Sequence, residues 1–163
     1  MKLEIAPTDL TSEADAAALL MLLDAYARDP MGGEKPLADD VKARLVPDLR
    51  ERIARGASVV LMARRESTPV GIAVCFVGYS TFAARPLLNL HDLAVVPEAR
   101  GLGVGQALLA AVDVQARARG CGKVTLEVRE DNARARRVYE HTGFVDYATG
   151  GKRTRALFLE KRL

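Results

Sequence analysis

The chain has 163 residues, of which 49% are hydrophobic, 28% charged and 5% aromatic. This length and composition are typical of a single folded domain. The formal net charge of +3 is too small, and the aromatic content too low, to indicate nucleic-acid binding. No stretch approaches the roughly 20 apolar residues of a membrane span, and the first residues lack the apolar core of a signal peptide. We therefore expect a cytoplasmic protein that binds neither nucleic acid nor membrane.

The two cysteines and two histidines do not form a metal-binding pattern. Cys75 and Cys121 have neither Cys-x-x-Cys spacing nor the Cys/His spacing of a zinc site. Both lie among aliphatic residues or glycines, where a reduced thiol is the simplest interpretation. The sequence thus predicts no metal centre and two reduced thiols.

The first part of the chain has the patterns of a strand and a helix. Residues 2–6 alternate polar and apolar side chains, which predicts a short strand. Thr11 and Ser12 then offer an N-cap for an Ala- and Leu-rich helix over residues 13–28. An Asp-Pro pair follows and should stop this helix, because the residue before proline disfavours helical backbone.

A second helix and two strands are predicted next. Apolar residues recur every four positions from Val41 to Ile53, which is the spacing of one helix face. Pro47 lies inside this pattern and should kink the helix or start a second helical piece. Strands are predicted at 58–64 and 70–79, separated by a turn-forming segment.

The second half of the chain alternates strands with helices. The predicted order is a strand at 87–96, a helix at about 103–119, a strand at 124–128, a helix at 132–142 and strands at 144–147 and 155–160. Together with the first half, this order predicts an α/β fold with one mixed sheet and helices on both of its faces.

A glycine-rich segment between the strand at 87–96 and the following helix carries the strongest chemical signal. Glycines let backbone N–H groups approach a ligand closely, and a helix start favours an anion. Three or four amides on a pyrophosphate would contribute on the order of 5–10 kcal/mol, whereas one exposed arginine contributes about 0–1 kcal/mol. We therefore expect the amides to dominate over the nearby arginines, which are Arg100, Arg134, Arg136 and Arg137. The alternative is a turn that only packs a helix against a sheet.

Two phosphate-binding motifs can be set aside. A P-loop requires Lys-Ser/Thr after its last glycine, but Gln106 and Ala107 occupy these positions. A dinucleotide-binding motif is matched by Gly101 and Gly103, but Gln106 replaces its third glycine. The paired βαβαβ halves of that fold are also missing from the predicted element order.

A third motif fits. The run Arg100-x-x-Gly103-x-Gly105 resembles the acyl-CoA pyrophosphate loop of the GCN5-related N-acetyltransferases. The resemblance covers essentially the whole chain and implies one domain, 1–163, with about seven strands in a single, mostly antiparallel sheet whose central strands splay apart. A second block supports it at the family's spacing, namely Asn132-x-x-Ala135-x-x-x-Tyr139-x-x-x-Gly143-Phe144.

The resemblance implies that acetyl-CoA is the acyl donor. Its pantetheine arm would lie where the central strands part, and a backbone N–H near Val95 would polarise the thioester carbonyl. Asn132 would bond the pantetheine arm, although an N-cap role would explain this residue as well. The implied acetyl-CoA-binding residues are Leu93, Ala94, Val95, Arg100, Gly101, Leu102, Gly103, Val104, Gly105, Gln106, Asn132, Arg134, Ala135 and Tyr139.

Three residues are the predicted catalytic groups. Tyr139 occupies the family's general-acid position, and a phenol of pKa about 10 keeps its proton for a departing thiolate at neutral pH. A place in the core face of its helix would also explain Tyr139. An acceptor ammonium of pKa about 10.4 must lose a proton before attack. His91 and Glu127 are the candidate bases, and strand alternation is expected to put His91 on the face opposite to Asp92.

The acceptor is predicted to be a small-molecule amine. The stretch 79–93 resembles the diamine and thialysine acetyltransferase branch, with His91 in place of a usual glutamate. The predicted substrate-binding residues are Glu34, Asp92 and Tyr79. We expect direct transfer in a ternary complex without an acyl-enzyme. Acetylation of a protein lysine or N-terminus, or a non-catalytic acyl-CoA-binding regulatory role, are the alternatives, and a homodimer is compatible with the resemblance.

Overall fold

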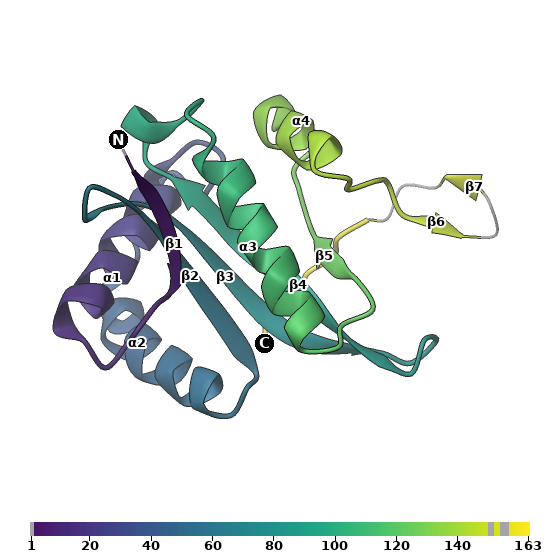
Figure 1. The fold of residues 1–163 in the computed structure, drawn as a ribbon, viewed down its shortest axis with the longest axis horizontal. Helices are drawn as coiled ribbons and strands as arrows, with labels where there is room; N and C mark the ends of the chain where they lie inside the picture. Colours follow the sequence, from purple (N-terminus) through teal and green to yellow (C-terminus); the bar gives the residue numbers. More distant parts are fainter. Residues whose placement is uncertain (1, 150–151, 154–156) are drawn as a thin grey trace.

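Figure 1 shows the fold in a computed structural model that describes residues 2–149, 152–153 and 157–163. Five strands form one sheet in the order β1-β2-β3-β4-β5, and two further strands form a separate hairpin. In the main sheet only the β4–β5 pair is parallel. The strands are β1 (Leu3–Pro7), β2 (Ser58–Arg65), β3 (Thr68–Ser80), β4 (Arg85–Val95), β5 (Val124–Leu126), β6 (Ala148–Thr149) and β7 (Lys152–Arg153). The helices are α1 (Glu13–Arg28), α2 (Asp39–Ala54), the short 3-10 helix η1 (Pro97–Ala99), α3 (Val104–Ala118) and α4 (Ala133–His141).

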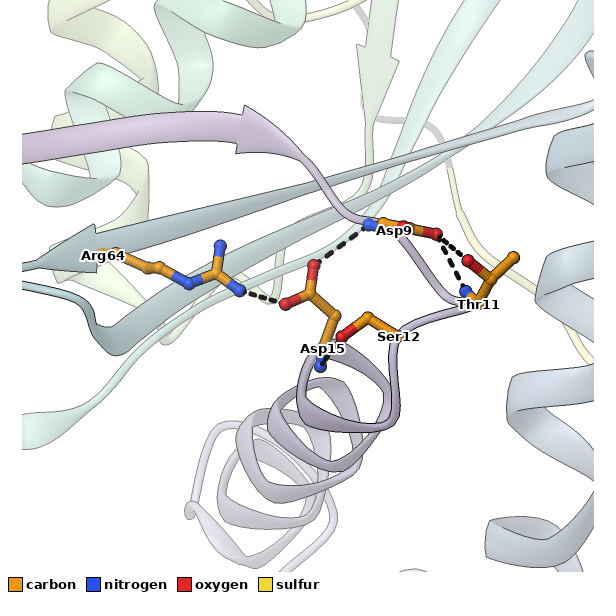
Figure 2. A network of polar contacts seen from close by, with 5 residues as sticks. All are labelled: Asp9, Thr11, Ser12, Asp15 and Arg64. Atoms are coloured by element: carbon orange, nitrogen blue, oxygen red, sulfur yellow. Dashed lines mark hydrogen bonds and ion pairs between the residues drawn. The ribbon is translucent and has the colours of Figure 1, made fainter.

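The start of α1 is fixed by a polar network that Figure 2 shows at close range. The Ser12 hydroxyl accepts a hydrogen bond from the Asp15 N–H, which confirms the predicted N-cap. The Asp15 carboxylate in turn accepts from the Asp9 N–H at 3.0 Å and pairs with Arg64 of β2 at 2.6 Å. These contacts attach the first turn of α1 to the sheet.

Helix α2 runs through Pro47 without a break. Proline has no N–H, so the carbonyl of Ala43 loses its usual helical partner. Packing compensates for this loss, because Leu49 is buried against the sheet together with residues of α1. The expectation that Pro47 starts a second helical piece is therefore wrong.

Helices lie on both faces of the sheet, as the sequence predicts (Figure 1), and each face has its own apolar core. On one face α3 packs its buried residues, including Leu108 and Val112, against the strands. On the other face α1 and α2 pack around Leu19, Leu22 and Leu49. Burial of both faces makes the sheet a rigid support for the loops at its ends.

A β-bulge in β4 changes which way one predicted site residue points. Val74 pairs with Asp92 and Cys75 pairs with Leu90, so His91 is an extra residue without a partner on β3. An extra residue shifts the alternation of side chains by one position. As a result Leu90 and Leu93 both contact the α3-side core.

The bulge overturns the predicted placement of His91. The His91 ring contacts the Phe76 ring edge-on at 5.3 Å, and Phe76 packs on the α1 side. Asp92 lies two residues before Ala94 in the same strand, so its side chain points to the same face as that of Ala94, which is the α1 side. His91 and Asp92 therefore lie on the same side of the sheet, and the expectation that His91 lies on the face opposite to Asp92 is wrong.

Strands β4 and β5 separate after three residue pairs. Leu88, Asn89 and Leu90 pair with residues 124–126, whereas β4 continues to Val95. Within the described residues, no strand covers the edge of β4 from residue 91 onwards. The expected splay is present, with β5 ending at Leu126 rather than at residue 128.

The C-terminal strands differ from the prediction. Residues 144–147 have no regular structure, and β6 pairs only with β7, in a hairpin set apart from the main sheet (Figure 1). Of the strand expected at 155–160, residues 155–156 lie outside the described residues and 157–160 are irregular. Their sequence favours a strand, but such a preference needs a neighbouring strand to be realised. The main sheet has five strands instead of about seven.

None of the helices described in the structure is long and apolar enough to cross a membrane.

Truncation of the α3 core should destabilise the fold that carries the site. The side chain of Leu108 is fully buried, so Leu108→Ala is expected to lower the free energy of unfolding by about 3 kcal/mol, measured by urea titration. The matched control is Val114→Ala on the same helix, where the side chain is exposed and the change should stay below about 0.5 kcal/mol. Equal losses for both variants would contradict the assigned packing of α3.

Candidate active site

The glycine-rich loop ends in the N-terminus of α3 with a row of unpaired backbone donors. Gly101 and Gly103 adopt the left-handed conformation, with φ of 77° and 80°, and Gly103 is the N-cap of α3. No side chain caps this helix. In the part of the chain that the structure describes, none of the N–H groups of residues 102–106 makes a well-formed hydrogen bond to a protein acceptor. This arrangement is suited to an anion.

The glycines are required by backbone conformation rather than by packing. A Cβ added at Gly101 or Gly103 would have no atom within 4 Å, so both residues are explained by their positive φ. At Gly105 the nearest atom would be a methyl carbon of Val138 at 4.0 Å. The loop is therefore open towards solvent, which does not fit a turn that only packs a helix against the sheet.

The uncovered edge of β4 continues this set of donors. The Val96 N–H donates to Val70 of β3 at 2.9 Å, so strand alternation turns the N–H of Val95 towards the uncovered edge. The Val95 carbonyl accepts from the Arg100 Nε at 3.0 Å instead of from a strand. The Val95 N–H and the peptide groups of Leu93 are left facing the space beside β5.

A cavity of about 120 Å³ lies between this edge and α4. It brings together six of the predicted site residues, namely His91, Leu93, Glu127, Asn132, Ala135 and Tyr139. Residues of α1 and of the α1–α2 loop complete its wall. Segments far apart in the sequence thus converge at the end of β4.

Tyr139 lines the cavity from α4 and is also part of the core. Its ring packs edge-on against Phe144 with centroids 5.7 Å apart, and it contacts the α3-side core. Burial and, to a smaller extent, the nearby Tyr26 raise the pKa of Tyr139 to about 12. The phenol therefore carries its proton at neutral pH. Tyr139 is thus a core residue that also lines the cavity, and its catalytic role stays a prediction.

Asn132 also serves two roles at the start of α4. Its Oδ1 accepts the Ala135 N–H at 3.1 Å, which confirms that it is the N-cap. The same side chain lines the cavity, and the cap leaves its amide N–H groups for a ligand. Ala135 follows on the wall of the cavity.

Two carboxylates, Asp92 and Asp29, act on Tyr26 at the α1 side of the cavity, although neither is among the residues that line it. Burial raises the pKa of Asp92, while the positive charge of His91 opposes this increase. Burial and the charges of Asp92 and Asp29 raise the pKa of the Tyr26 phenol. This wall is chemically suited to a cationic group, because a half-buried carboxylate gains from a positive partner.

Several predicted residues lie outside the cavity wall. Tyr79 is 63% exposed and stands opposite Pro86 in the β3–β4 hairpin. Glu34 is exposed in the α1–α2 loop, where its charge acts on Arg129. Arg134 is exposed at the start of α4, and its charge acts on Asp29.

Neither cysteine is placed as a nucleophile. Cys75 is fully buried in the α3-side core, and burial raises the pKa of its thiol to about 12. Cys121 follows α3 and does not line the cavity. Among the described residues, no group of three or more His, Cys, Asp or Glu side chains could hold a metal ion.

Sequence reasoning missed the contribution of α1. Tyr26 and Met31 line the cavity from the last turn of α1 and the following loop. The only available signal was an aromatic residue with a hydroxyl group near the end of an Ala- and Leu-rich helix. Its place opposite β4 depends on how α1 packs, which no local pattern shows.

Comparisons with known proteins agree with this geometry. The model of the Acetyltransferase (GNAT) family matches residues 19–144. The chain is 31% identical over 146 residues to the uncharacterized N-acetyltransferase YhfO of Bacillus subtilis (strain 168), covering 82% of this chain and 90% of that protein. It also superimposes on AAC(6')-Iy in complex with the bisubstrate analogue CoA-S-monomethyl-acetylneamine, with a TM-score of 0.77, 19% identity and full coverage of both chains. An acetyltransferase of Trypanosoma brucei gives a TM-score of 0.68 at 25% identity, with 97% of this chain and 100% of that chain covered.

Alanine substitutions at two glycines should distinguish the cost of a strained backbone from the effect of adding a Cβ where there is room for one. Gly103 has a φ of 80°, so Gly103→Ala is expected to lower the free energy of unfolding by about 1–2 kcal/mol. Gly105 lies inside α3 with room for a Cβ, so Gly105→Ala should stabilise by up to about 1 kcal/mol. Urea unfolding measures both variants. An unchanged stability for Gly103→Ala would show that the left-handed turn is not present in solution.

Proposed function

Because this chain belongs to the acetyltransferase (GNAT) family, we propose that it transfers the acetyl group of acetyl-CoA to a primary amine of a small molecule. The observation that carries this proposal is the unpaired row of N–H groups at residues 102–106, next to the uncovered edge of β4. Tyr139 lies in the cavity at the same edge. This combination provides a place for a diphosphate, an amide-containing arm and a reacting carbonyl.

The donor would be held mainly by backbone groups. The N–H groups of residues 102–106 would bind the pyrophosphate at the positive end of α3. The peptide groups of Leu93 would pair with amides of the pantetheine arm, and the free side-chain amide of Asn132 would bond it from the other side. The N–H of Val95 would then polarise the thioester carbonyl, as an oxyanion site does.

The transfer itself would be a direct displacement. The amine nitrogen attacks the thioester carbonyl carbon, a C–N bond forms and the C–S bond breaks. The phenol of Tyr139 donates its proton to the departing thiolate, and the proton released by the amine passes to a base. His91 and Glu127 both line the cavity and are the two candidates, acting directly or through water. The buried Cys75 supports a route without an acyl-enzyme.

The acceptor side favours a small amine. The cavity is closed on one side by Tyr26 and Met31 instead of opening into a flat groove. The half-buried Asp92 would attract a positively charged group towards this side of the cavity, and Glu34 lies exposed in the α1–α2 loop. The relative in complex with a CoA–aminoglycoside conjugate makes polyhydroxylated amines worth testing beside polyamines and amino acids. A homodimer and a cytoplasmic location stay predictions.

The proposal is tested by thiol release from acetyl-CoA across four acceptor classes: polyamines, amino acids, aminoglycosides and peptides. We expect thiol release above the rate without acceptor for at least one small amine, with the acetylated product confirmed by mass spectrometry. Transfer to peptides alone would overturn the small-molecule assignment. Binding of acetyl-CoA without transfer to any class would favour the non-catalytic alternative.

Removal of the Tyr139 hydroxyl should impair turnover and spare donor binding. Tyr139→Phe keeps the ring contact with Phe144 and removes the proton donor, so kcat is expected to fall by about 10²–10⁴-fold with little change in acetyl-CoA affinity. The matched control is Tyr147→Phe, because Tyr147 is exposed and does not line the cavity. Unchanged turnover in Tyr139→Phe would mean that water or another group protonates the thiolate.

A further inference from the structure

We propose that Arg100 is a positioning residue that clamps the cofactor loop to the acceptor side of the cavity, and not a phosphate ligand. This inference rests on the proposed function, because it concerns the two sides of the same site. The sequence motif places Arg100 at the start of the pyrophosphate loop, where a cation would be expected to face the phosphates. The contacts of its side chain point the other way.

A continuous chain of polar contacts runs through Arg100. Its Nε donates to the Val95 carbonyl at 3.0 Å, and its Nη2 donates to Asp29 Oδ2 at 2.7 Å. The other carboxylate oxygen of Asp29 accepts the Met31 N–H at 2.9 Å. The chain therefore begins at the uncovered edge of β4 and ends at a residue that lines the cavity wall.

Charge and burial explain why this contact persists. The guanidinium is already neutralised by a carboxylate, and the Met31 N–H together with Arg100 holds the pKa of Asp29 below its usual range. The two side chains are only 32% and 17% exposed, so water screens the pair less than it would a surface ion pair. A diphosphate at residues 102–106 would have to compete with Asp29 for Arg100.

The clamp joins the end of α1 to the start of the cofactor loop. Asp29 is the C-cap of α1 and its carbonyl accepts the Gly32 N–H, so it fixes the start of the α1–α2 loop. Arg100 directly precedes the amides of the cofactor loop. When a bound coenzyme orders the cofactor loop, this contact therefore also restricts the motion of Met31 and its neighbours on the acceptor side.

The chain offers a matched control for this contact. Arg64 and Asp15 form another pair of an arginine with an α1 aspartate, at 2.6 Å and with side chains 24% and 20% exposed (Figure 2). This pair lies at the opposite end of α1 from Asp29. Arg64→Gln therefore removes a comparable ion pair without touching the proposed clamp.

The test compares Arg100→Gln, Asp29→Asn, the double variant and Arg64→Gln. CoA serves as the probe, its affinity is measured by calorimetry, and hydrogen exchange is followed in peptides that cover residues 29–37. In the native chain, CoA should slow exchange there by at least about fivefold. Both clamp variants should lose this protection while the Kd for CoA stays within about threefold. The double variant should match the single ones, since both changes break one contact, and Arg64→Gln should retain the protection.

The outcomes separate the clamp from the proposed function. A loss of CoA affinity of about tenfold or more in Arg100→Gln, but not in Asp29→Asn, would identify a phosphate ligand and overturn the clamp. CoA binding to the native chain without any change at residues 29–37 would also overturn it. If the native chain does not bind CoA, the proposed function itself fails. Asp29→Asn provides the answer on its own should Arg100→Gln not fold.

Discussion

The one-sided pairing of β4 is the constraint on which the rest of the site depends. This strand pairs with β3 along its length apart from the bulge at His91, but with β5 only over Leu88–Leu90. Beyond that point its outward peptide groups need another partner, because an unpaired buried peptide group is costly. A ligand with amides of its own meets this need by acting as an added strand. The glycine loop follows directly, so on the proposed function the same end of β4 would orient both a linear arm and the anion attached to it.

The bulge at His91 gives this strand two functions at once. Before the bulge, Leu88 and Leu90 contact the α3-side core, and after it Leu93 does so again. The extra residue lets His91 and Asp92 both approach the α1 side, next to Tyr26, without removing an apolar side chain from the core. A regular strand would have to bury one of these polar side chains in the α3-side core. A single inserted residue thus keeps the apolar side chains of β4 in the α3-side core while both polar side chains face the α1 side.

Sequence patterns identify the local features of this protein and miss those that depend on distant partners. The cap at Ser12, the glycine turn before α3 and the cap at Asn132 each involve residues a few positions apart, and all three were predictable. The bulge at His91 depends on the register with β3, and the Arg100–Asp29 contact joins residues 71 positions apart. The strand expected at 144–147 is wrong for the same reason, because among the described residues no strand pairs with this segment.

The buried phenol of Tyr139 sets a condition on the proposed chemistry. Its pKa of about 12 lies well above that of an ordinary thiol, about 8.5, so proton transfer to a thiolate is uphill in the free protein. A positive charge beside the phenol lowers its pKa. Attack by an amine creates such a charge on the nitrogen at the moment when the thiolate departs. On the proposed mechanism, the acid would therefore act most readily once an amine has attacked the thioester.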